Sequence, residues 1–176
     1  KCNKSTHVNL TNHSYWNLEK NKKNMIYNHE LKLNSHKYLQ INKNLIPTGR
    51  FKNVKKSIYD FLHFENIGKK LDYFKNKKLN SKFKGFDTTF SVKKNIRNYV
   101  GTLKNNNTNI QVDFFSNLPG VQLYSAQNLN YKKKLFPYQG ICLETQYFPD
   151  APNKKNFPST LIKPNKRYTC FTKIKI

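Results

Sequence analysis

The chain has 176 residues, a length that suits one domain. Its mean hydropathy is −0.85, and no apolar run approaches the ~20 residues of a membrane helix, which excludes a protein that spans a membrane with helices. The formal charge of +24 comes from 33 Lys and Arg residues against nine acidic ones, so the partner of this basic surface has to be considered first.

The basic residues leave two interpretations open. Lys and Arg can neutralise the phosphates of a nucleic acid. However, only Arg50, Arg97 and Arg167 are arginines, and Arg is the side chain that best matches phosphate and guanine. Most lysines are mixed with Asn, as in 20–24 and 104–107, a composition that solvated surfaces tolerate. We therefore expect no specific nucleic-acid partner, although nonspecific attraction to anions follows from the charge.

The cysteines indicate the cellular compartment, and the first residues indicate whether the chain is part of a longer one. Cys2, Cys142 and Cys170 are odd in number and far apart, which argues against a disulfide framework and favours a reducing, cytoplasmic location. No Cys–His spacing resembles a zinc site, and we expect no metal. Residues 1–4 lack both an initiator Met and the apolar core of a signal peptide, so we expect a piece of a longer chain.

The first half of the chain reads mainly as short strands. Alternation begins in 7–18 and indicates further strands in 26–33 and 38–41, before a turn at Pro47-Thr48-Gly49. An apolar but short run follows in 57–64. Residues 69–79 fit a helix or a charged loop, and we favour the loop.

The second half continues the same pattern. A strand is expected at Ser91-Val92, after Gly85–Phe90, and a hairpin pairs 99–103 with 110–115 across an Asn-rich turn. Val121–Tyr124 alternates again, and 161–162 and 168–176 close the chain. No segment shows a sustained helical period with caps. Short strands at near-regular spacing predict an all-β sandwich or barrel without a second domain.

The central stretch is 140–153, GICLETQYFPDAPN. Alternation puts Cys142, Glu144 and Gln146 on one face of a short strand, which Pro149 and Pro152 end. A carboxylate in such apolar surroundings is costly unless it is used. The alternative is a glutamate of an edge strand that faces water.

Three further polar side chains stand at the ends of strand-like runs or beside turns. His13 can be a hydrogen-bonded turn residue or an acid catalyst, Asp87 can cap a turn or bind a ligand, and Gln122 can be an ordinary polar strand residue. No glycine-rich phosphate loop, nucleophile elbow or metal cluster supports a nucleotide-binding or hydrolase function.

Several sequence motifs, taken together, resemble those of one protein family. In order and at similar separations, the aldose 1-epimerases (galactose mutarotases) share motifs with this chain: NLTNHSYWNL (9–18), LIPTG (45–49), GFDTTF (85–90), PGVQLYS (119–125) and GICLETQYFPDAPN (140–153). The resemblance covers nearly the whole chain. It implies a galactose mutarotase-like β-sandwich (supersandwich), here partial, formed by the C-terminal portion of a single epimerase domain over residues 1–176.

The resemblance also implies functional roles, without a metal or cofactor. The family pattern places the general acid on His13 and the general base on Glu144. It places sugar-hydroxyl contacts on Asp87 and Gln122, and it puts Tyr15 and Trp16 in the segment that lines the pocket. The implied substrate is an aldohexose, whose α and β anomers interconvert when one group takes the proton of the C1 hydroxyl and another protonates the ring oxygen. A carboxylate and an imidazole suit these tasks near neutral pH.

Some positions depart from the family pattern. Thr88-Thr89 replaces the usual His-Asn, Ser125-Ala126-Gln127 replaces Thr-Gly-Asn, and the loop 131–134 is Lys-rich instead of Gly-rich. The family's N-terminal part, which supplies an Asn-Arg pair and a further His, has no counterpart here. We therefore expect the chain alone to fold poorly or self-associate. A catalytically impaired carbohydrate-binding protein is the alternative to an active epimerase, and a nucleic-acid-binding protein comes third.

Overall fold

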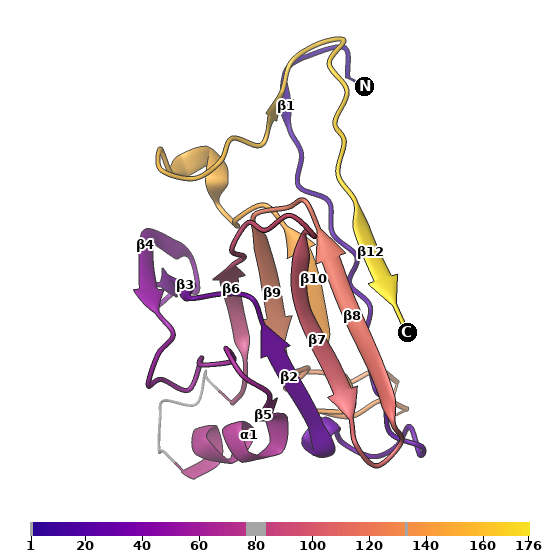
Figure 1. Cartoon of the computed structure of the whole chain (residues 1–176). Helices are drawn as coiled ribbons and strands as arrows, with labels where there is room; N and C mark the ends of the chain where they lie inside the picture. The colour runs from indigo at the N-terminus through magenta and orange to yellow at the C-terminus, as the bar shows by residue number, and fades with distance from the viewer. Residues whose placement is uncertain (1, 77–83, 133) are drawn as a thin grey trace.

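The computed structural model describes residues 2–76, 84–132 and 134–176. Most of its regular structure is β-strand, and Figure 1 shows how the elements are arranged. In chain order they are β1 (Thr6–His7), the 3-10 turn η1 (Ile26–Asn28), β2 (His29–Leu33), β3 (Lys37–Ile41), β4 (Pro47–Asn53), β5 (Glu65–Asn66), α1 (Ile67–Asn76), β6 (Asp87–Ser91), β7 (Tyr99–Asn105), β8 (Ile110–Ser116), β9 (Gly120–Tyr124), β10 (Cys142–Gln146), the 3-10 turn η2 (Ala151–Asn153), β11 (Leu161–Ile162) and β12 (Thr172–Lys175).

Two antiparallel five-stranded sheets form the body of the molecule. One has the strand order β10-β9-β6-β3-β4, and the other has the order β12-β8-β7-β2-β5. In Figure 1 the strands β2, β7 and β8 pass in front of β9 and β10. The short pair β1–β11 lies apart from both sheets, at the top of the view. The expected all-β sandwich is thus confirmed.

The core lies between the two sheets. Alternation along each strand turns one set of side chains inward. From one sheet come Leu31, Leu103 and Phe114, and from the other come Val121 and Leu123, all at most 1% exposed. Many of the aromatic residues pack in this core. Phe61 and Phe74 stand edge-on to Phe86, with ring centroids 5.3 and 5.1 Å from that of Phe86. Rings of this size bury enough area to compensate for a hydrophobic content of only 36%.

The prediction of a loop over residues 69–79 is wrong for the part of this segment that the structure describes. Helix α1 spans Ile67–Asn76, while Lys77, Lys78 and Leu79 lie outside the described residues. The side chain of Asn66 accepts a hydrogen bond from the Lys69 amide (2.9 Å), which caps the helix start. Ile67, Leu71 and Phe74 then recur at helical spacing and are buried.

Several strand boundaries also differ from the sequence prediction. The turn expected at Pro47-Thr48-Gly49 is wrong, because these residues begin β4. In the expected strand 26–33, the first three residues form η1, and β2 begins only at His29. The strand expected at Ser91-Val92 instead begins at Asp87, so Asp87 belongs to β6 and is not a turn cap. The hairpin β7–β8 is confirmed, with paired residues from Asn105–Ile110 outward.

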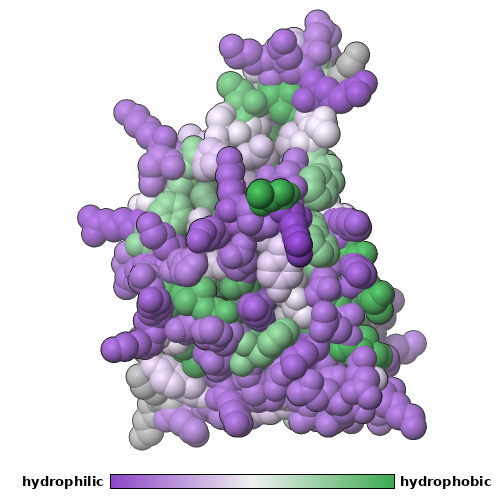
Figure 2. Space-filling view, viewed as in Figure 1, coloured by the Kyte–Doolittle hydropathy of each residue, from purple (hydrophilic) through white to green (hydrophobic). Residues whose placement is uncertain are grey.

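The surface is mainly hydrophilic, which agrees with the expectation that the lysine-rich segments are solvated. Figure 2 shows that hydrophilic residues cover most of the face turned to the viewer, with smaller hydrophobic patches between them. Among the described residues, no helix is both long and apolar enough to cross a membrane.

Candidate active site

Three neighbouring strands present polar side chains on the sheet face that points away from the core. β6, β9 and β10 are antiparallel, and inward-facing Val121 and Leu123 of β9 alternate with outward-facing Gln122 and Tyr124. The register then aligns two rows of residues across the strands, Thr89–Gln122–Glu144 and Asp87–Tyr124–Cys142. Three strands from separate parts of the sequence therefore present side chains on one surface.

The N-terminal segment lies along the free edge of β10. The Asn9 side chain donates to the Tyr147 carbonyl (3.1 Å) and accepts from the Tyr147 amide (2.8 Å). Trp16 and Ile141 exchange backbone hydrogen bonds of 2.8 and 2.9 Å. Because both ends of this stretch are bonded to the edge, His13 between them is held beside the strand that carries Glu144.

A buried polar cluster anchors the far end of the same segment. The Leu18 amide donates to Nε2 of His29 (2.7 Å), and the Leu18 carbonyl accepts from the Thr108 hydroxyl (2.9 Å). Glu19 accepts a 2.8 Å hydrogen bond from the Asn105 side chain. Burial lowers the pKa of His29 to about 4, so at neutral pH its ring is uncharged and can accept the Leu18 hydrogen bond.

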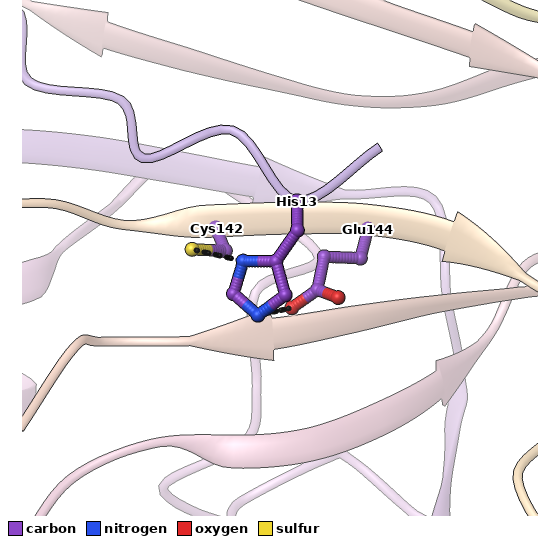
Figure 3. A group of neighbouring side chains, drawn as sticks. All are labelled: His13, Cys142 and Glu144. Atoms are coloured by element: carbon purple, nitrogen blue, oxygen red, sulfur yellow. Dashed lines mark hydrogen bonds and ion pairs between the residues drawn. The ribbon is translucent and has the colours of Figure 1, made fainter. Parts of the chain in front are cut away.

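His13 and Glu144 contact each other across this face. Nε2 of His13 lies 3.5 Å from Oε1 of Glu144, and Figure 3 shows the ring between the carboxylate and the sulfur of Cys142. Glu144 is only 7% exposed, so the alternative of a glutamate that faces water is wrong. Burial raises the pKa of Glu144; the nearby His13 opposes this and the Asp87 carboxylate adds to it. A base whose pKa is raised toward neutrality binds a proton more readily.

Cys142 occupies the other side of the imidazole. Its sulfur is 3.6 Å from Nδ1 of His13, and burial raises the pKa of the thiol to about 12. The sulfur can accept a hydrogen bond from the Nδ1–H group, which leaves Nε2 directed at Glu144. The sequence analysis placed Cys142 on this face but gave it no role.

Asp87 and Gln122 form a second polar pair. The Gln122 amide donates to Oδ1 of Asp87 over 2.6 Å, and its carbonyl oxygen accepts from the Thr89 hydroxyl. These contacts fix which end of the amide faces Asp87. Partial loss of water raises the pKa of Asp87, and the hydrogen bond from Gln122 opposes this. Thr88 is buried on the opposite face, so of the two threonines only Thr89 belongs to the site.

Aromatic rings border the acid–base pair. Tyr15 stacks on the His13 ring with centroids 5.1 Å apart and remains 46% exposed, so it can offer a face to a ligand. Tyr124 stands edge-on to both rings at 6.4 Å. Trp16 does not line this surface as expected, because it packs edge-on against Phe114 of the core. Tyr124 was missed, although its place two residues after Gln122 indicates the same face.

The structure thus brings together all five candidate residues: His13, Tyr15, Asp87, Gln122 and Glu144. The arrangement offers one proton donor, one proton acceptor, a carboxylate–amide pair for hydroxyl groups and an exposed ring. It is suited to proton transfer on a small polyhydroxylated molecule.

Comparisons with known proteins show which family this chain belongs to. The sequence model described as Aldose 1-epimerase matches residues 1–175. Galactose mutarotase from Sus scrofa is 31% identical over 175 residues, covering 96% of this chain and 49% of that protein. The aldose 1-epimerase of Escherichia coli is 27% identical over 174 residues, or 94% and 49% of the two chains. The chain therefore spans about half the length of the curated relatives it matches.

Solved structures show the same fold. An aldose epimerase homologue from C. elegans superposes with a TM-score of 0.81 at 21% identity, over 98% of this chain and 51% of the other. Galactose 1-epimerase from Lactobacillus acidophilus gives a TM-score of 0.71 at 22% identity, over 98% and 48%. These likenesses establish a galactose mutarotase-like architecture.

Proposed function

Because this chain belongs to the aldose 1-epimerase family, we propose that its His13–Glu144 pair interconverts the α and β anomers of a hexose such as galactose or glucose. The observation that carries the proposal is the 3.5 Å contact between an imidazole and a buried carboxylate on a face that also holds Asp87 and Gln122. Since the chain covers about half of its relatives, we also propose that residues 1–176 are the C-terminal portion of a single epimerase domain.

The first half-reaction opens the sugar ring. Glu144, as the carboxylate, takes the proton of the C1 hydroxyl, and the electron pair of that O–H bond forms the C1 carbonyl. The bond between C1 and the ring oxygen breaks, and the ring oxygen takes the Nε2 proton of His13, which begins the cycle as the imidazolium. The product is the open-chain aldehyde, with Glu144 protonated and His13 neutral.

The second half-reaction closes the ring on the other face. Rotation about C1–C2 presents the opposite side of the carbonyl to the same hydroxyl. Neutral His13 takes the proton of this hydroxyl as its oxygen attacks C1, and Glu144 returns its proton to the carbonyl oxygen. Both residues end in their starting states, so the cycle is balanced without a cofactor.

The neighbouring groups have binding roles in this proposal. The Asp87 carboxylate accepts hydrogen bonds from sugar hydroxyls, and the Gln122 amide donates to them. The contact between the two side chains fixes their orientation before the sugar arrives. The exposed ring of Tyr15 covers the C–H face of the sugar. We further propose that the protein works in the cytoplasm, which is consistent with three cysteines that are all free thiols.

Polarimetry of fresh α-D-galactose tests the proposal in the intact protein that contains these residues. Glu144→Gln keeps the size of the side chain but removes the base, and we expect the catalysed rate to fall by about 100-fold or more. Glu65→Gln is the matched control and should retain full activity, because Glu65 lies in β5 of the other sheet and pairs with Lys70 of α1.

Two outcomes would contradict an active epimerase. If wild-type protein does not accelerate anomer exchange but binds the sugar, the carbohydrate-binding alternative is correct. If Glu144→Gln and Glu65→Gln are equally active, the carboxylate of Glu144 is not the base.

A further inference from the structure

One atom each from His13, Cys142 and Glu144 lies within 4.8 Å of the other two. Imidazole nitrogen, thiolate sulfur and carboxylate oxygen are the three ligand types that zinc uses in proteins. We propose that these side chains form a binding site for Zn²⁺ or a similar thiophilic divalent cation, with water as the fourth ligand. The ion competes with the sugar chemistry and is not a cofactor of it.

Two of the three ligands are already placed at suitable distances. In a tetrahedral zinc site with Zn–S of ~2.3 Å and Zn–N of ~2.0 Å, sulfur and nitrogen are about 3.5 Å apart. The Cys142 sulfur and Nδ1 of His13 are 3.6 Å apart. An ion can therefore replace their hydrogen bond without moving the backbone.

The carboxylate reaches the ion by a side-chain rotation. Glu144 now faces Nε2, on the other side of the imidazole from the sulfur (Figure 3). It stands two residues after Cys142 on β10, so both side chains leave the same face of one strand. The His13 side chain is half exposed, which gives the ion a path from solvent.

Local charge favours a cation here despite the basic surface. Asp87 and Glu144 are two of only nine acidic residues in the chain, and the strand register places Asp87 in one row with Cys142. Cys142 is fully buried, and low surrounding polarity strengthens the attraction between ligands and ion. Binding releases the thiol proton to water, so the affinity rises with pH.

Occupancy has a direct consequence that rests on the proposed function. The same ion that takes Cys142 as a ligand removes both the imidazole and the carboxylate from proton transfer. Anomer exchange should therefore slow as Zn²⁺ is added and recover when a chelator removes it.

The binding test uses Co²⁺ as a spectroscopic probe of the intact protein, with reductant-free buffer and thiols reduced beforehand. We expect one equivalent of Co²⁺ to produce a near-ultraviolet sulfur-to-cobalt charge-transfer band and visible bands of a tetrahedral ion, and Zn²⁺ to displace them. Cys142→Ser should abolish the charge-transfer band and His13→Ala should remove the tetrahedral spectrum. Cys170→Ser and Cys2→Ser are matched controls that should keep both.

The absence of a charge-transfer band in wild-type protein, or a band that survives in Cys142→Ser, would overturn the proposal. So would a band that disappears in Cys170→Ser or Cys2→Ser. The test is independent of catalysis. A cobalt spectrum in a protein without epimerase activity would contradict the proposed function alone. Anomer exchange without a cobalt spectrum would contradict the metal site alone.

Discussion

At the scale of single residues, burial raises the pKa of the base Glu144, and a second carboxylate adds to the rise. Glu144 is buried beside His13, and the negative charge of Asp87 adds to the rise in its pKa. A carboxylate at 7% exposure would be a liability in a protein that had no use for it. Its charge is tolerable here because an imidazole stands 3.5 Å away.

This coupling predicts a pH shift in Asp87→Asn. The neutral amide no longer raises the pKa of Glu144, so the base stays ionised to lower pH, and the acid limb of the kcat/KM profile should move to lower pH. Loss of a charged hydrogen-bond partner should also raise KM by about tenfold. Asp113→Asn, on the other sheet, is the control and should change neither quantity. An acid limb that stays in place or moves upward would show that the two carboxylates are not coupled.

Only part of this site could be predicted from the sequence. Alternation alone placed Cys142 and Glu144 on one face, and the family resemblance supplied the roles of His13, Asp87 and Gln122. The contact between His13 and Cys142 joins residues separated by 129 positions, so no local spacing could indicate it. The same holds for the stacking geometry of Tyr15 and Tyr124, which depends on how the N-terminal segment crosses the sheet edge.

At the scale of elements, the edge of β10 positions the acid against the base. The segment that carries His13 is bonded to β10 through its backbone and short side chains, and at its far end it is tied to His29 and Thr108. Gly140 allows a close approach at the start of the strand. A methyl group there would come within 2.9 Å of Cβ of Tyr15, a distance that real structures avoid.

Gly140→Ala should therefore lower activity more than stability. The added methyl displaces the backbone at Tyr15, and His13 two residues earlier moves with it. Misplacement of a catalytic group by about 1 Å can cost up to 100-fold, so we expect a fall in kcat of roughly 10- to 100-fold. Denaturant unfolding measured in parallel should show a much smaller effect. Full activity in this variant would mean that the contact does not position His13.

The helix α1 shows why element prediction from the sequence was incomplete. Its signals were present, because Asn66 caps it and Ile67, Leu71 and Phe74 recur at helical spacing. They were missed because the segment was read from Lys69, which left out the cap and the first apolar residue. Gly68 also lowers helix propensity, yet a side chain there would collide with the Tyr27 carbonyl at 2.7 Å, so packing outweighs propensity.

At the scale of the whole molecule, the chain exposes more surface than its mass predicts. The accessible surface is 11,224 Å² for 20.9 kDa. A compact monomer of this mass exposes about 9,000 Å². Several large apolar side chains contribute to the excess, among them Leu10, Ile46, Phe136 and Phe171, each more than 40% exposed. Such surface favours association.

We therefore predict that the 176-residue chain alone self-associates or folds poorly. Size-exclusion chromatography with light scattering should show species larger than 20.9 kDa, and circular dichroism should show a broad thermal transition. The high positive charge does not prevent this in ~0.15 M salt, where repulsion is screened beyond about 8 Å. A monomer that unfolds in one cooperative transition would contradict the prediction.

The central claim is that His13 and Glu144 act as one proton-transfer unit on a sugar. It is tested most directly by exchange NMR of the α and β anomeric protons of galactose with His13→Asn, Glu144→Gln and the double variant. Groups that act as a unit are not additive, so the double variant should lose no more activity than the worse single variant. Losses that multiply in the double variant, or single variants that exchange anomers at the wild-type rate, would contradict the claim.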